Sequence, residues 1–168
     1  MSQYAEARML HAYEEHASVR PYGLAVLRLV VGTVFTAHGA QKLFGAWGGG
    51  GVSGTTAHFT QLGLEPAYPL AVTAGVVEFA GGLLLLVGAL TLYASAVLGI
   101  QMAAAIWKVH LANGFFFSAN GYEFNLTLIG ALLCLMLTGP GALSIDGRRA
   151  SHAARAAAGR ARIRFGKV

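Results

Sequence analysis

Between Lys42 and Lys108 the chain contains no lysine or arginine, and the only charged side chains in this stretch are Glu65 and Glu78. Over the whole chain, charged residues make up 11% and hydrophobic residues 55%, whereas about 25% of the residues in ordinary soluble domains are charged. A soluble protein of 168 residues cannot cover its surface with so few charges. The sequence therefore predicts an integral membrane protein built as one domain.

Four apolar segments are long enough to cross a bilayer, which requires about 20 residues of helix. They are about Tyr22–Phe44, Tyr68–Leu90, Thr91–Leu111 and Tyr122–Thr138. Pro21 stands at a helix-start position before the first segment, and "GPG" at 139–141 closes the fourth. Segments two and three follow each other almost without a loop, so they form an antiparallel hairpin. We expect an all-α fold, an integral membrane four-helix bundle that is antiparallel, with a short interfacial helix within "TAHFTQLGL" of the first outer loop.

Basic residues gather at the two ends of the chain. Arg8 and Arg20 precede the spans, and the long loops at 45–66 and 112–121 contain no lysine or arginine. The tail carries seven basic residues: Arg148, Arg149, Arg155, Arg160, Arg162, Arg164 and Lys167. The positive-inside rule then predicts that both termini are cytoplasmic and that both loops lie outside.

The charge pattern divides the chain into three segments: a cytoplasmic N-terminal segment (1–20), a four-helix domain (21–145) and a basic cytoplasmic tail (146–168). We expect the tail to contact anionic lipid headgroups of the bilayer. Nucleic acid is not expected as a partner, because alanine fills the spaces between the arginines and no aromatic ladder accompanies them. In the second loop, the three phenylalanines at 115–117 are expected to bury at the membrane interface.

Nine polar residues lie in or at the ends of the spans: Arg28, His38, Gln41, Lys42, Glu78, Gln101, Lys108, His110 and Glu123. A charge at the bilayer centre costs about 3 kcal/mol on insertion scales, so such residues usually face the bundle interior and pair. At about 100° per residue, each span has a small or polar stripe that we expect to face inward. The stripes are Arg28, His38, Gln41 and Lys42; Glu78 with Ala71, Ala74, Gly75, Gly82 and Ala89; Gln101 and Lys108 with Ala94, Ala104, Ala105 and Ala112; and Glu123, Thr127, Gly130 and Cys134.

Charge and depth together suggest ion pairs inside the bundle. Glu78 lies near the midplane and should be buried within reach of a donor. Its partner is either Arg28 or Lys42, and the sequence alone does not choose between them. Glu123 is expected to pair with a lysine near the outer end of the spans.

The chain resembles the DoxX family over about residues 24–146. The stretches that carry the resemblance are "LRLVVGTVFTAHGAQKLFG", "LGLEP", "VVEFAGGLLLLVGALT", "VHLANGFF", "GYEF" and "GPGALSID". The resemblance implies a four-helix protein of the inner (plasma) membrane that associates with oxidoreductases. Some relatives are subunits of thiosulfate:quinone oxidoreductase, and others are linked to membrane complexes that handle oxidative stress and sulfur compounds.

We expect one polar pocket near the outer membrane surface as the ligand-binding site. His38, Lys42, Lys108 and Glu123 would form it, and Gln41 and Glu78 would extend it inward. Its candidate ligands are a quinone headgroup, which needs hydrogen-bond donors, and a small anion, which needs the lysines. Glu78 could also relay protons. The alternative is that the same residues form only a structural network between helices.

No intrinsic cofactor, metal site or catalytic residue is assigned from the sequence, and quinone is the candidate ligand. The histidines at 38 and 110 suggest axial haem ligands, but His110 lies nearly opposite the polar face of its span, and no ligand cluster has zinc spacing. Cys134 has no partner cysteine. The expected function is the membrane subunit or anchor of a quinone-linked oxidoreductase whose soluble or membrane partner performs the chemistry. The alternative is a non-catalytic scaffold or small-anion carrier.

Overall fold

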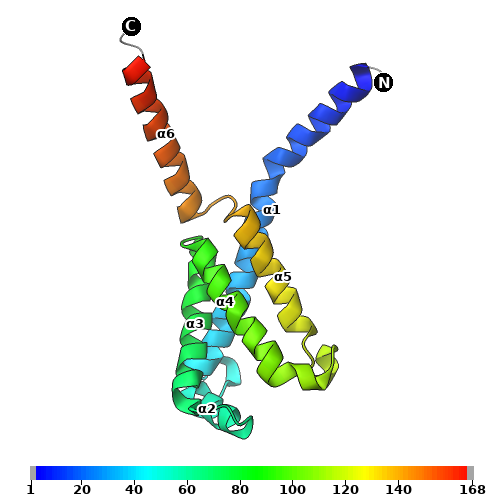
Figure 1. The fold of residues 1–168 in the computed structure, drawn as a ribbon, viewed down its shortest axis with the longest axis vertical. Helices are drawn as coiled ribbons and strands as arrows, with labels where there is room; N and C mark the ends of the chain where they lie inside the picture. Colours follow the sequence, from blue (N-terminus) through cyan, green and yellow to red (C-terminus); the bar gives the residue numbers. More distant parts are fainter. Residues whose placement is uncertain (1–2, 166–168) are drawn as a thin grey trace.

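The structure is a computed structural model that describes the backbone of residues 3–165 and the side chains of residue 8 and residues 18–160. Six α-helices make up most of the described chain (Figure 1): α1 (Gln3–Phe44), α2 (Gly51–Gln61), α3 (Ala67–Val87), α4 (Thr91–Ala105), α5 (Glu123–Thr138) and α6 (Ile145–Phe165). Helix α4 continues through a π-helical turn, η2 (Ile106–His110), and a 3-10 turn, η3 (Leu111–Asn113). Two further 3-10 turns, η1 (Ala46–Gly48) and η4 (Phe117–Ala119), lie in the connections.

The expected all-α membrane bundle is confirmed. Among the described residues, three helical segments are long and apolar enough to cross a membrane: Ser18–Phe44, Ala67–Val87 and Thr91–Asn113. The fourth apolar helix, Glu123–Thr138, is shorter, with 16 residues. The short helix expected in the first loop is α2. Helices α1 and α6 project from the same end of the bundle, which we call the termini end, and α2 lies at the opposite loop end (Figure 1).

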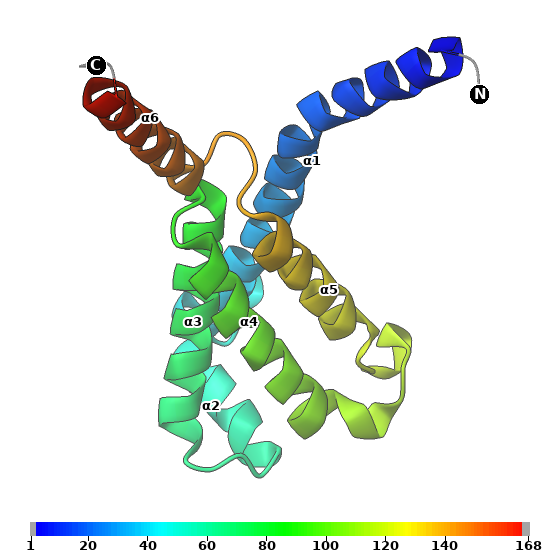
Figure 2. The ribbon, with the colours of Figure 1, turned by 45° about the horizontal axis from the view of Figure 1, so that its top comes forward.

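Helix α1 does not begin at Pro21, so that prediction was wrong. The helix runs from Gln3 and includes the proline, and it therefore crosses the expected boundary between residues 20 and 21. A proline inside a helix lacks one N–H donor and disturbs the preceding turn. Figure 2 shows the N-terminal arm of α1 leaning away from the rest of the helix. The carbonyl of Pro21 accepts a hydrogen bond from the N–H of Ala142 at 2.8 Å, which ties α1 to the segment after α5.

Helices α1 and α3 touch through their backbones. A Cβ atom on Gly39 would lie 2.3 Å from the backbone nitrogen of Phe79, and one on Gly82 would lie 2.4 Å from the backbone nitrogen of Thr36. Glycines at such positions let membrane helices approach closely, and van der Waals packing then stabilises the pair. The small-residue face predicted for α3 is largely confirmed, because its buried residues are Ala67, Ala71, Gly75, Glu78, Gly81, Gly82 and Leu85.

The tight turn between α3 and α4 confirms the predicted antiparallel hairpin. Gly88 ends α3 in the left-handed conformation at φ 66°. The N–H of Ala89 donates to the carbonyl of Leu84 at 3.0 Å, and the N–H of Gly88 donates to the carbonyl of Leu85 at 3.1 Å. This pair of bonds is a Schellman motif, which satisfies the last carbonyls of the helix.

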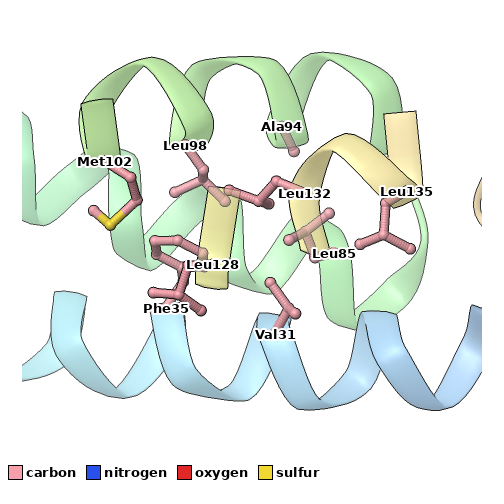
Figure 3. Packing of buried hydrophobic residues seen from close by; sticks show 9 residues of the cluster. All are labelled: Val31, Phe35, Leu85, Ala94, Leu98, Met102, Leu128, Leu132 and Leu135. Carbon is pink, nitrogen blue, oxygen red and sulfur yellow. The ribbon is translucent and has the colours of Figure 1, made fainter. Parts of the chain in front are cut away.

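The core of the bundle is apolar. Nine buried residues from four helices form one cluster in the described chain (Figure 3): Val31, Phe35, Leu85, Ala94, Leu98, Met102, Leu128, Leu132 and Leu135. Leucines of α3, α4 and α5 therefore fill the centre of the bundle. These side chains pack closely there, and the buried charged residues Arg28 and Glu78 lie outside this cluster.

The inward face predicted for α5 was wrong. Asn125, Leu128, Leu132 and Leu135 are its buried residues, whereas Thr127 and Gly130 are exposed and Cys134 is half-buried. The hydroxyl of Thr127 donates to the carbonyl of Glu123 at 2.9 Å. A threonine that bonds to the preceding turn in this way has no need of a partner on another helix.

The face predicted for α4 was only partly right. Ala94 is buried and Gln101 is half-buried, but Ala104 and Lys108 are exposed. The prediction assumed regular α-helical spacing between Gln101 and Lys108. The π-turn η2 begins at Ile106, and a π-turn inserts about one extra residue, which rotates everything after it by about 100°. Lys108 therefore leaves the face of Gln101.

The helix contact of α1 and α3 is tested by adding a methyl group to it. In Gly39→Ala, the new Cβ has to push Phe79 away, so the free energy of unfolding should fall by about 1–3 kcal/mol. Thermal unfolding of the detergent-solubilised protein measures this. Gly130→Ala is the matched control, because nothing lies within 4 Å of a Cβ at that position. Equal midpoints for the two variants would contradict the close contact.

Candidate functional site

Three helices meet at a buried ionic site, which we call the Lys42–Glu78–Gln101 triad. Lys42 of α1 forms an ion pair with Oε1 of Glu78 in α3. The side-chain amide of Gln101 in α4 donates to the same oxygen at 2.8 Å and to the carbonyl of Ala74 at 3.3 Å. Glu78 is 2% exposed. The predictions that Glu78 is buried within reach of a donor, and that Arg28 or Lys42 is its partner, are thus confirmed, and the partner is Lys42.

The triad forms because α1 ends halfway along α3. A Cβ on Gly75 would lie 2.7 Å from the side chain of Leu43, so the last turn of α1 rests on the middle of α3. This places Lys42 level with Glu78, although the sequence put Lys42 near the outer end of its span and Glu78 near the midplane. Helix α2 covers the same region, and the hydroxyl of its Thr55 donates to the carbonyl of Lys42 at 3.3 Å.

The two charged members of the triad differ in how exposed their side chains are. Glu78 is buried, whereas the side chain of Lys42 is 30% exposed. The second carboxylate oxygen of Glu78, Oε2, is buried and has no hydrogen-bond partner among the described residues. An ammonium group has three N–H donors. Lys42 therefore has donors left over beside a carboxylate oxygen that is free to accept.

The other residues predicted to line the site are not members of the triad and make separate contacts. His38 is exposed one turn before Lys42, and its ring centroid lies 6.3 Å from that of Phe124 on α5. Gln41 is half-buried. A Cβ on Gly49 would lie 2.6 Å from the carbonyl oxygen of Gln41, so the loop after α1 packs closely on this residue.

Lys108 and Glu123 do not form the expected ion pair: in the part of the chain that the structure describes, the lysine–carboxylate pair within 4.0 Å is Lys42–Glu78. The ammonium of Lys108 lies 3.8 Å above the ring of Trp107, a cation–π contact. Glu123 is half-buried in the first turn of α5, where the positive end of the helix dipole favours a carboxylate. Lys108 thus contacts the neighbouring Trp107, and Glu123 is stabilised by its position at the start of α5.

His110 is engaged in the loop between α4 and α5. Its Nδ1 lies 2.9 Å from the carbonyl of Asn120, and the amide of Asn113 donates to the same carbonyl at 3.2 Å. Cys134 is a free, half-buried thiol. Within the described residues, no group of three or more His, Cys, Asp or Glu is placed to hold a metal ion.

A second polar centre lies at the termini end, where sequence reasoning missed the role of Asp146. Arg28 is 1% exposed, and its Nη2 donates to the carbonyls of Ala142 and Leu143 at 3.3 and 3.2 Å. The two oxygens of Asp146 accept from the backbone N–H groups of Leu90 and Thr91 at 3.0 and 2.8 Å. Arg28 thus ties α1 to the segment after α5, and Asp146 ties the start of α6 to the start of α4. No local signal in the sequence links these residues.

The backbone of α4 holds Asp146 in its charged form. Burial acts to raise the pKa of Asp146, but the hydrogen bonds from Thr91 and Leu90 and the charge of Arg149 outweigh burial, so the pKa lies below its ordinary value. A carboxylate at this position also complements the positive N-terminal end of the α4 dipole. Asp146 therefore anchors the start of α6 to the turn between α3 and α4.

The fold and the charged triad define a small helical membrane protein, and comparison with known proteins gives its family. The family model described as DoxX matches residues 23–111 of the 168 residues. The chain belongs to the DoxX family. The matched region covers the first three spans and contains all three members of the triad.

Relatives extend the similarity beyond that region. A Haemophilus influenzae protein named "Uncharacterized protein" is 35% identical over 77% of this chain and 92% of its own length. The "Inner membrane protein YphA" of Escherichia coli is 30% identical over 81% of this chain and 96% of its own length. The "Putative oxidoreductase CatD" of Bacillus subtilis is 30% identical over 74% of this chain and 84% of its own length. No solved structure matches the chain.

The ion pair of the triad leads to predictions for the stability of a single and a double variant. Lys42→Met leaves the carboxylate of Glu78 buried without its counter-charge, and removing one partner of a buried ion pair typically costs about 3–5 kcal/mol. The double variant Lys42→Met, Glu78→Gln removes both charges and should recover most of that loss. Chemical or thermal unfolding in detergent measures both variants.

The control for this pair is Lys108→Met, which removes an exposed lysine. It should change the free energy of unfolding by less than about 1 kcal/mol. If the single variant Lys42→Met were as stable as the parent protein, or if the double variant were no more stable than the single one, the buried ion pair would not be a structural element.

Proposed function

We propose that this protein is the membrane subunit of a quinone-linked oxidoreductase, and that it binds the quinone headgroup at the Lys42–Glu78–Gln101 triad. The observation that carries the proposal is the pairing of a reachable donor with a free acceptor. Lys42 is 30% exposed, and Oε2 of Glu78 has no partner among the described residues. A quinone carbonyl accepts a hydrogen bond, and a quinol hydroxyl donates one. Lys42 would meet the first need directly. Oε2 of Glu78 is buried, so it would meet the second once neighbouring side chains move aside.

The surroundings of the triad suit a ligand that diffuses in the bilayer. His38 and Lys42 are four residues apart, so they project from the same side of α1, and His38 is exposed. A quinone entering from lipid would meet His38 before Lys42. The apolar side chains around the site would hold the ring, as in other ligand sites with a few well-placed polar groups.

The chemical step is assigned to a soluble or membrane partner protein, so this chain anchors and supplies quinone and is not catalytic alone. The name of the Bacillus subtilis relative, "Putative oxidoreductase CatD", supports a redox role. The name of the Escherichia coli relative, "Inner membrane protein YphA", supports the inner membrane as the location. The second candidate function is a non-catalytic scaffold, and the burial of Glu78 at 2% exposed favours it, because a closed ion pair can act purely as a link between helices.

Quinone binding distinguishes these two functions. The full-length protein in lipid nanodiscs would be titrated with ubiquinone-1 and with menadione by calorimetry. We expect binding by the parent, at least about tenfold weaker binding by the double variant Lys42→Met, Glu78→Gln, and unchanged binding by Lys108→Met, since the loss of one charged donor contact is worth about a factor of ten.

The remaining outcomes decide against the proposal. If the parent binds neither quinone, the scaffold function replaces the quinone site. If Lys108→Met weakens binding as much as the double variant does, the triad is not where the quinone binds. Correct folding of each variant is checked by its elution as a single species and by its helical circular dichroism.

The proposed orientation has both termini in the cytoplasm, because basic residues concentrate at the end from which α1 and α6 project. Ser53 is exposed in α2 at the loop end, and Ser151 is exposed in α6. In intact cells, a membrane-impermeant maleimide should label Ser53→Cys and should leave Ser151→Cys unlabelled until the cells are opened. The parent protein reports the background from Cys134. The reverse labelling pattern would invert the topology.

A further inference from the structure

A groove of about 410 Å³ opens at the termini end of the bundle, away from the triad. One wall is Pro21 of α1, the floor is the segment 141–144, and the other wall is the first turns of α6 with Arg148, His152 and Arg155. A volume of this size falls within the range of small-molecule sites. The groove therefore has room for a phosphate-bearing headgroup.

The α6 wall presents unpaired positive charge. Arg148, His152 and Arg155 are spaced by four and three residues, which places them on one side of the helix. All three are exposed. Neither arginine has a carboxylate within 4.0 Å in the part of the chain that the structure describes. Arg149 and Arg160 lie on a different side of α6, about 100° away. The groove thus brings together two arginines and a histidine, and among the described residues no carboxylate is paired with either arginine.

The floor of the groove is held in place by interactions already present. Arg28 binds the carbonyls of Ala142 and Leu143 from inside the bundle. The hydroxyl of Ser144 donates to the carbonyl of Gly141 at 2.9 Å and accepts from the N–H of Gly147 at 3.1 Å, which caps the start of α6. Gly141 packs so tightly on α1 that a Cβ there would lie 2.6 Å from the carbonyl oxygen of Pro21. A ligand would therefore meet a preformed surface.

The position of the groove indicates where its ligand comes from. The first candidate span begins at Ser18, so Pro21 lies in the first turn of the membrane-crossing part of α1. Leu143, which lines the groove, is 73% exposed, and Tyr22, the residue after Pro21, is 60% exposed. A tyrosine and a leucine beside basic residues match a boundary between acyl chains and headgroups. A free phosphate in solution would have no use for that apolar rim.

We propose that this groove binds the phosphate group of an anionic phospholipid from the leaflet at the termini end, with Arg148 and Arg155 as the charged contacts. The site is a defined headgroup pocket, which is a stronger statement than a general attraction between the basic tail and the membrane. His152 and Ser151 line the same groove, and the hydroxyl of Ser151 donates to the carbonyl of Gly147 within α6 at 2.9 Å. The proposal is independent of quinone binding at the triad.

The test compares two pairs of arginines that carry the same total charge. Arg148→Gln, Arg155→Gln empties the groove of its arginines, and Arg149→Gln, Arg160→Gln removes two from the other side of α6. The full-length protein in a neutral detergent is titrated calorimetrically with short-chain phosphatidylglycerol, phosphatidylcholine and inorganic phosphate. We expect phosphatidylglycerol to bind at least about tenfold more weakly to the groove variant, and within about twofold of the parent to the control variant, because only the first loses direct charge-assisted contacts.

Three results would overturn the proposal. Equal weakening by the two pairs would mean a diffuse attraction to the basic helix. Equal binding of phosphatidylcholine and phosphatidylglycerol to the parent would mean that the groove does not select an anionic headgroup. Binding of inorganic phosphate as tight as that of the lipid, with displacement of the lipid, would assign the site to free phosphate. Each variant should show the helical circular dichroism of the parent and elute as a single peak. These two checks distinguish a lost binding site from a folding defect.

Discussion

The contact between the backbones of α1 and α3 is the constraint on which the rest of the bundle depends. In lipid, burial of apolar surface gives no advantage to helix association, so close packing has to stabilise the pair. Gly39 and Gly82 bring the two helices together where a methyl group would not fit. That contact fixes the relative height of the helices. As a result, the ammonium of Lys42 reaches the carboxylate of Glu78, which is buried in the bundle and would otherwise lack a counter-charge.

Much of the fold could be predicted because hydropathy and the demand for satisfied backbone groups leave few alternatives inside a membrane. The spans, the hairpin and the buried Glu78 follow from that logic. Which face of a single helix is buried is less constrained by the sequence. Thr127 satisfies its hydroxyl within α5 and can face outward. The π-turn at Ile106–His110 carries Lys108 off the face of Gln101, and neither a side chain nor a spacing in the sequence announces such a turn.

The two polar centres differ in how far they could be predicted from the sequence. The triad contains an ion pair between side chains of opposite charge, and opposite charges can be read from a sequence. Of the two predicted partners for Glu78, Lys42 is correct. Arg28 and Asp146, by contrast, bind backbone groups far away in the chain. A backbone carbonyl or N–H looks the same at every residue, so a sequence cannot show which one a buried guanidinium or carboxylate will meet. The structure alone supplies that information.

The length of α5 has a consequence for the membrane itself. Its 16 residues span about 24 Å at 1.5 Å per residue, whereas a typical hydrocarbon core is about 30 Å thick. The three longer spans match that thickness and the fourth falls short. The bilayer beside α5 must therefore be pulled thinner, or polar groups at its ends must reach outward. Where the bilayer thins, the lipid around the bundle is no longer uniform, and a neighbouring protein with a short span of its own would bind there with less mismatch.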